Sequence, residues 1–169
     1  MERAGRAIAG AVRRDFEEIG GFPADGRILV LAGKGHNGGD ALLAAQALLE
    51  EFPAARAEVC LVFGVRSLRP LALRAYRQLV HAAPRRVAAM APGNSIVGKG
   101  TARRSPVKAA AHQGGLGYDL CLDGIFGYQF RPPVDPVVAA LLERVNALAV
   151  RLRAAVDLPS GLGDGDQGA

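Results

Sequence analysis

The feature that most constrains the fold is a glycine-rich segment at residues 33–40, with the sequence Gly-Lys-Gly-His-Asn-Gly-Gly-Asp. Residues 27–32, directly before it, form a short apolar run with β-branched side chains, which is typical of a buried strand. Residues 41–51, directly after it, carry apolar side chains at helical spacing. Glycines let backbone N–H groups approach an anion closely, and a helix N-terminus attracts phosphate. The segment therefore predicts a strand, a nucleotide-binding loop and a helix.

The same alternation of strand and helix continues along the chain. Apolar periodicity and runs predict helices at residues 4–16, 41–51, 70–83 and 136–150, and strands at residues 27–32, 57–63, 118–123 and 154–158. Strands that alternate with helices build a mostly parallel sheet. We therefore expect an α/β fold, a three-layer Rossmann-like arrangement with helices on both faces of the sheet.

Composition limits the remaining possibilities. A length of 169 residues fits a single domain over residues 1–169, and the 50% hydrophobic content is enough for a core of its own. Neither a membrane-spanning run nor a signal peptide is recognisable, so we expect a cytoplasmic protein with no membrane partner. Cys60 and Cys121 lie in apolar stretches without metal-ligand spacing, which predicts buried free thiols.

Residues 91–117 differ from the rest of the chain. Gly, Ser and Pro punctuate this segment, and its charged residues are all basic. The pattern predicts a surface insertion without a catalytic residue. Although the net charge is +5, the basic residues lack interleaved aromatic side chains, so we expect no nucleic acid partner.

Two further polar loops follow predicted strands. Residues 123–127 read Asp-Gly-Ile-Phe-Gly, and residues 157–161 read Asp-Leu-Pro-Ser-Gly. Because ligands bind at the carboxyl ends of parallel strands, these loops and the glycine-rich segment can converge on one crevice. Simpler interpretations stay open: Asp40 can cap its helix, and Asp123 can end its strand in an Asx-turn.

Four motifs carry a resemblance to the NAD(P)HX epimerase family, also described as YjeF N-terminal. Residues 35–40 resemble its Gly-Asn-Asn-Gly-Gly-Asp signature, and residues 123–127 resemble its Asp-x-x-Phe-Gly loop. Residues 156–161 are similar to its Val-Asp-Ile-Pro-Ser-Gly, and residues 1–5 are similar to its first-helix motif. Against this pattern we expect both ends of the chain to be truncated. His36 and Tyr128 depart from the family sequence.

The resemblance implies an isomerase that interconverts the R and S epimers of NADHX and NADPHX, the hydrated forms of NADH and NADPH, and that can form a homodimer. It implies a potassium ion (K+) held by Asn37, Asp123 and Ser160. For the acid or base, Asp157 is the first candidate and Asp40 the second. The implied ligand contacts are His36, Asn37, Gly38, Gly39, Asp40, Gly127, Tyr128, Gln129, Phe130, Arg131, Pro132, Pro133 and Asp157.

An alternative function on the same fold is a non-catalytic nucleotide-binding module, or a scaffold for protein or RNA assembly. The presence of Asn37, Asp123, Asp157 and Ser160 together favours the enzyme, because a scaffold has no chemical need for all four.

Overall fold

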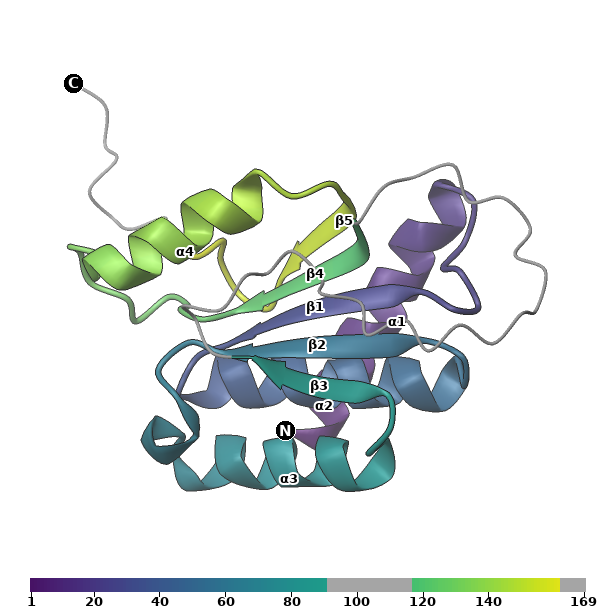
Figure 1. The fold of residues 1–169 in the computed structure, drawn as a ribbon, viewed down its shortest axis with the longest axis horizontal. Helices are drawn as coiled ribbons and strands as arrows, with labels where there is room; N and C mark the ends of the chain where they lie inside the picture. The colour runs from purple at the N-terminus through teal and green to yellow at the C-terminus, as the bar shows by residue number, and fades with distance from the viewer. Residues whose placement is uncertain (91–116, 162–169) are drawn as a thin grey trace.

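A computed structural model describes residues 1–90 and 117–161, and the statements that follow concern these residues. They form a five-stranded parallel sheet in the order β3-β2-β1-β4-β5 (Figure 1). The strands are β1 (Arg27–Ala32), β2 (Arg56–Leu61), β3 (Val87–Met90), β4 (Tyr118–Gly124) and β5 (Val150–Ala155). The helices are α1 (Glu2–Glu18), α2 (His36–Glu51), α3 (Pro70–Ala82) and α4 (Pro136–Asn146), with a short 3₁₀ helix, η1 (Val65–Ser67).

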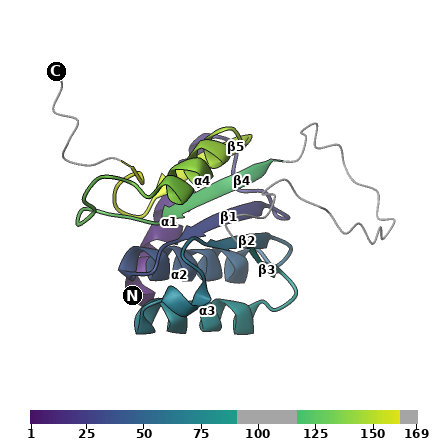
Figure 2. The same ribbon diagram turned by 60° about the vertical axis from the view of Figure 1, so that its left-hand side comes forward.

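Helices cover both faces of the sheet. On one face α2 packs against the strands, and α1 and α3 flank α2 (Figure 2). On the other face α4 packs through Val138, Leu141 and Val145 against side chains that include Leu29 and Leu31 of β1. Alternate side chains of β1 therefore enter two separate cores, as expected for a central parallel strand. The predicted three-layer Rossmann-like fold is confirmed.

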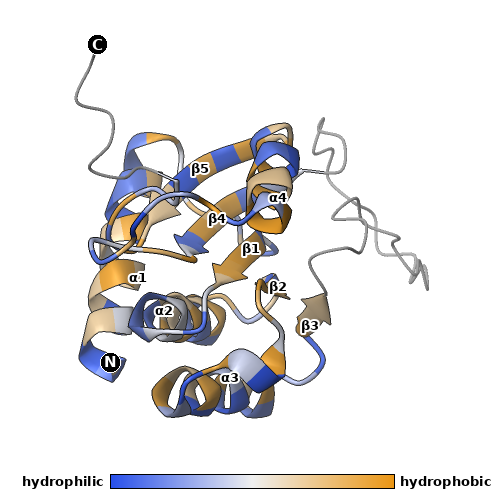
Figure 3. Ribbon diagram, turned by 90° about the vertical axis from the view of Figure 1, so that its left-hand side faces the viewer, coloured by the Kyte–Doolittle hydropathy of each residue, from blue (hydrophilic) through white to orange (hydrophobic). Residues whose placement is uncertain are grey.

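The central strand β1 and the edge strand β5 differ in burial, and their sequences reflect this difference. In β1 every residue after Arg27 is buried, so the strand is almost continuously apolar. In β5 exposed arginines alternate with half-buried Val150 and Leu152, and the ribbon alternates in colour accordingly (Figure 3). β5 thus has the alternating pattern of a strand with one solvated face.

The order of the strands positions the site. From β1 the chain moves outward to β2 and β3, and it then crosses to the opposite side of β1 to form β4 and β5. A ligand crevice forms where the direction of winding reverses, outside the carboxyl ends of the strands. Gly33 N–H donates to Gly124 O at 3.0 Å, which holds the segments after β1 and β4 together at this point.

Several boundaries differ from those that the sequence predicts. β5 covers Val150–Ala155 rather than the predicted 154–158. The sequence did not show its first residues as a strand, because Arg151 and Arg153 interrupt the apolar run. The predicted helix at 136–150 accordingly ends earlier, at Asn146. The short strand β3 was not expected, since four residues give too little pattern. Apart from Gly117, the predicted insertion at 91–117 lies outside the described residues.

Both cysteines are buried and free, as predicted. Burial raises the pKa of Cys60 to about 11 and the pKa of Cys121 to about 12, so both thiols stay protonated near neutral pH. Among the described helices, none is both long enough and apolar enough to span a membrane.

Candidate functional site

The glycine-rich segment is mostly the first turns of a helix rather than a loop. The apolar periodicity predicts a helix that starts at residue 41, but α2 begins at His36 with Gly35 as its N-cap. Asp40 therefore lies in the second turn and is not the cap that one interpretation proposed. A Cβ on Gly38 would overlap the backbone of Gly33, so glycine is what lets the helix start this close to the end of β1.

Asn37 joins α2 to the segment that follows β4. Its side-chain Nδ2 donates a hydrogen bond to Phe126 O at 2.7 Å. The amide oxygen of Asn37 takes no part in this bond, because the amide group donates only through its nitrogen. The bond thus fixes the side chain while leaving an oxygen available as a ligand.

Asp123 is the central acceptor of the site. Its Oδ1 accepts from Ser160 Oγ at 2.6 Å and from Ile125 N at 3.2 Å, and its Oδ2 accepts from Ser160 N at 2.7 Å. The bond to Ile125 N is the Asx-turn of the simpler interpretation, and the bonds to Ser160 are the predicted convergence of loops. Both interpretations of Asp123 hold in the same structure. Ser160 Oγ in turn accepts from Phe126 N at 3.1 Å.

Gly127 lies between two of the predicted site residues. A Cβ at this position would come within 2.5 Å of Asp157 Oδ2 and would overlap Asn37 Nδ2. Asp157 Oδ2 also accepts a hydrogen bond from Tyr128 N at 2.7 Å. The carboxylate of Asp157 is therefore held beside Asn37, while Asp157 itself is exposed and open to a ligand.

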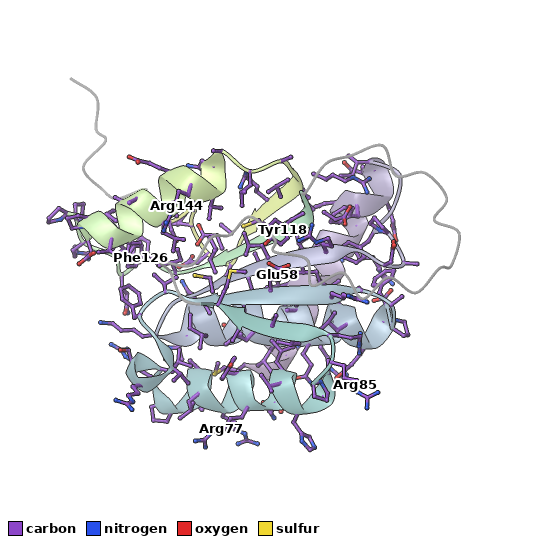
Figure 4. The ribbon with its side chains drawn as sticks, in the orientation of Figure 1. Glu58, Arg77, Arg85, Tyr118, Phe126 and Arg144 are labelled. Atoms are coloured by element: carbon purple, nitrogen blue, oxygen red, sulfur yellow. The ribbon has the colours of Figure 1, made fainter. Side chains whose placement is uncertain are left out.

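The segment after Gly127 folds back on itself. Phe130 stacks on Phe126 with a centroid distance of 4.3 Å, and Arg131 donates to Tyr128 O at 3.3 Å and to Phe130 O at 2.9 Å. Tyr128 is 71% exposed, so little of its side chain packs against the protein. Figure 4 shows Phe126 at the edge of the sheet where this segment leaves β4. Gln129, Pro132 and Pro133 are exposed in the same segment.

Asp40 sits apart from this hydrogen-bond network. Burial raises the pKa of Asp40, and the positive charges of the N-terminal amine and of His36 act in the opposite direction. Among the described residues, its Oδ1 is buried without a hydrogen-bond partner. The roles of Asp40 and of its exposed neighbour His36 stay predictions.

The structure thus brings Asn37, Asp123, Ser160, Gly127 and Asp157 to one edge of the sheet from three separate segments. We call the side chains of Asn37, Asp123, Asp157 and Ser160, which are held by these hydrogen bonds to one another or to the segment 125–128, the edge cluster. Sequence reasoning missed the backbone of Phe126, which accepts from Asn37 and donates to Ser160. Its place inside the Asp-x-x-Phe-Gly motif was the available signal, because a motif of this kind fixes backbone as well as side-chain positions.

Three members of the edge cluster, Asn37, Asp123 and Ser160, offer oxygen donors with one formal negative charge among them. Asn37 supplies an amide oxygen, Ser160 a hydroxyl and Asp123 a carboxylate. Within residues 1–90 and 117–161, no group of three or more His, Cys, Asp or Glu side chains gathers in a way that could hold a metal ion. A single carboxylate with neutral oxygens is a donor set that fits a hard monovalent cation.

Comparison with known proteins agrees with the arrangement of the motifs. The family described as YjeF-related protein N-terminus matches residues 1–169. The chain belongs to this family. The chain is also 37% identical over 163 residues to the bifunctional NAD(P)H-hydrate repair enzyme Nnr of Gloeobacter violaceus, and 33% identical over 162 residues to the NAD(P)H-hydrate epimerase of Bordetella pertussis.

These relatives are longer than the chain described here. Both alignments cover 96% of this chain, but they cover 26% of the Gloeobacter enzyme and 57% of the Bordetella epimerase. The crystal structure of yeast ynu0 matches the fold with a TM-score of 0.63 and 26% identity, over 95% of this chain and 60% of the yeast chain. This YjeF-related domain therefore has the fold of the yeast protein and matches one part of each relative.

Proposed function

We propose that this chain is an isomerase that interconverts the R and S epimers of NADHX and NADPHX. The named relatives support this substrate class, since one is an NAD(P)H-hydrate epimerase and another is an NAD(P)H-hydrate repair enzyme. The observation that carries the proposal is the edge cluster itself. Direct hydrogen bonds join Asp123 to Ser160, 37 residues away, and Asn37 to Phe126, 89 residues away. A tight turn at the glycine-rich segment alone would not require this convergence.

Asp157 is the acid or base in this proposal. Epimerisation at a carbon that bears a hydroxyl needs a group that accepts and returns a proton as the hydroxyl leaves and comes back. Asp157 Oδ2 is held by Tyr128 N, which fixes the carboxylate while its side chain remains exposed to a ligand. Its second oxygen then serves as the proton acceptor. Asp40 remains the second candidate for this role.

The N-terminus of α2 is the proposed site for the pyrophosphate of the substrate. Backbone N–H groups at the start of a helix attract anions, and the N-cap Gly35 leaves open space where a side chain would otherwise stand. Since α2 starts beside the end of β4, a phosphate here would leave the nicotinamide ring within reach of the loop that carries Asp157. The helix thus positions the substrate and the carboxylate acts on it.

Asn37, Asp123 and Ser160 are the proposed ligands of a potassium ion. When bound, the ion would supply positive charge that attracts the substrate phosphates. The side chains themselves fix the geometry of the site, since Asp123 orients Ser160 and Asn37 holds the backbone of Phe126 in place. The cation thus acts by binding and orientation, while proton transfer belongs to Asp157.

The test is direct conversion of one epimer into the other. Purified protein is mixed with R-enriched NADHX in potassium buffer, and the epimer ratio is followed by chromatography beside a control without protein. The proposal expects the ratio to approach equilibrium at least about a hundredfold faster with protein, the range that a positioned acid or base supplies. Equal rates with and without protein would overturn it and favour the non-catalytic scaffold.

The expected homodimer is tested separately by sedimentation.

A further inference from the structure

Three exposed basic side chains lie at the carboxyl ends of β1 and β2. Lys34 follows β1, Arg66 lies in η1 after β2, and Arg69 is the N-cap of α3. Arg69 N donates a hydrogen bond to Lys34 O at 2.8 Å, so the segments after the two strands are joined directly. We call Lys34, Arg66 and Arg69 the basic cluster.

No carboxylate neutralises the basic cluster in the part of the chain that the structure describes. None of its three side chains takes part in a salt bridge there, whereas Arg13, Arg27 and Arg151 are paired with acids. Residues 59–118, which include Arg66 and Arg69, contain no Asp or Glu, so these two arginines have no acid nearby in the sequence. Like charges that gather without a counter-charge raise the local positive potential and attract anions.

The basic cluster and the edge cluster lie on opposite sides of β1 at the carboxyl end of the sheet. β2 pairs with β1 on the side away from β4, so the basic cluster flanks the start of α2 from one side and the edge cluster flanks it from the other. Phe63 contacts a residue of each side: Lys34 Nζ is 5.5 Å from its ring centroid, and the ring centroid of Phe126 is 6.2 Å from it.

A dinucleotide that binds across such a crevice has its two nucleosides on opposite sides of the helix N-terminus. Our proposed function places the nicotinamide ring beside Asp157, which leaves the adenosine ribose on the side of β2. NADPHX differs from NADHX by a phosphate at the 2′ position of this ribose. A phosphate carries two negative charges and three acceptor oxygens, which arginine binds through paired N–H groups.

We propose that the basic cluster binds the 2′-phosphate of the adenosine ribose and makes the chain prefer NADPHX to NADHX. This inference rests on the proposed function for the direction of the ligand. Arg66 and Arg69 supply the paired donors, and Lys34, held over the Phe63 ring, adds a point charge. These residues select the substrate and take no part in the epimerisation.

Binding of substrate fragments tests this site without the reaction. Calorimetry compares adenosine 2′,5′-bisphosphate with adenosine 5′-phosphate, which lacks the 2′-phosphate. At low ionic strength the wild type should bind the bisphosphate about tenfold or more tightly. The double variant Arg66→Ala/Arg69→Ala should lose most of this difference, while Arg66→Lys/Arg69→Lys should keep part of it because the charge remains.

A matched control removes two arginines elsewhere. Arg77 is an exposed residue of α3 and points outward from the molecule (Figure 4). Arg85 is exposed just after the end of α3, on the side of the molecule away from Phe126 (Figure 4). Arg77→Ala/Arg85→Ala changes the net charge equally and should keep the preference for the bisphosphate within about twofold. Equal binding of the two nucleotides by the wild type would overturn the inference, and so would an equal loss in both double variants.

The second measurement is the ratio of kcat/KM for NADPHX to kcat/KM for NADHX. It should fall about tenfold in Arg66→Ala/Arg69→Ala and stay unchanged in the control variant. An unchanged ratio in both would contradict the specificity role. If the wild type epimerises neither substrate, the proposed function fails, and the fragment comparison still decides whether the basic cluster recognises the 2′-phosphate.

Discussion

The hydroxyl of Ser160 donates a 2.6 Å hydrogen bond to the carboxylate of Asp123, across a separation of 37 residues. The backbone N–H of Ser160 donates to the same carboxylate at 2.7 Å. These two bonds fasten the loop after β5 to the end of β4, and they explain why an Asp in one motif and a Ser in another belong to one site. Asp123 thus has a structural role that exists before any ligand binds.

Asp123→Ala should remove the stabilisation of the protein by potassium, whereas Ser160→Ala should reduce it only in part. Asp123 supplies the only formal charge among the three proposed ligands, and a hard cation gains most from an anionic oxygen. The measurement is the thermal midpoint in potassium chloride and in choline chloride at equal ionic strength. Loss of three hydrogen bonds to a carboxylate should also cost Asp123→Ala more than about 2 kcal/mol of unfolding free energy in either salt.

Asp25→Ala is the control for that experiment, since Asp25 is an exposed acid in the turn between α1 and β1. This variant should keep the response of the wild type to potassium. A wild type whose thermal midpoint is the same in both salts would contradict the cation site. A potassium response that Asp123→Ala retains would contradict the assignment of Asp123 as a ligand of the ion.

Gly127→Ala should abolish activity and destabilise the fold. The added Cβ would meet the side chains of Asn37 and Asp157, so one or both must move away from the site. Overpacking of this kind costs about 1–3 kcal/mol. Urea unfolding and the epimer assay measure the two effects. As the matched control, Gly10→Ala in α1 has open space beyond the Arg14 side chain and should be stabilised by up to about 1 kcal/mol. A fully active Gly127→Ala would show that the close approach is not required.

Asp40→Asn should stabilise the protein at neutral pH, with an effect that disappears in acid. Burial raises the pKa of Asp40 in the folded protein above its ordinary value of 3.8. Ionisation therefore costs the folded state more than the unfolded state, and stability is lost as the pH rises through this raised pKa. Urea unfolding at pH 7 and at successively lower pH compares the variant with the wild type. A difference in stability that is independent of pH would contradict this account of Asp40.

The fold was predictable from the sequence because most of its elements have strong patterns. The buried run of β1 and the helical periodicity of α3 identify both elements to within a residue. Prediction failed where the pattern is weak or conflicts with composition. Glycines hid the first turn of α2, since glycine disfavours a helix interior, yet here only glycine at position 38 avoids an overlap with the backbone of Gly33. Arg151 and Arg153 hid the start of β5, because charged side chains on an exposed strand face resemble a loop.

The site was predictable only as a set of side chains. Parallel strands bring their carboxyl ends to one edge, so the grouping of Asn37, Asp123 and Ser160 follows from the order of elements. The hydrogen bonds through the backbone of Phe126 could not be predicted, since they depend on the path of the chain after β4 rather than on residue type. For the same reason the basic cluster was not recognised: Lys34 and Arg69 meet only because β1 and β2 pair in parallel.

The most direct test of the central claim is the rate of epimer interconversion by Asp157→Asn beside the wild type. Asn keeps a side-chain oxygen that can accept the hydrogen bond from Tyr128 N, so the fold is retained while the proton acceptor is removed. With R-enriched NADHX in potassium buffer, the wild type should equilibrate the epimers, and the variant should be about 10²–10⁴-fold slower. A variant as fast as the wild type would contradict the claim that this carboxylate at the edge cluster carries the reaction.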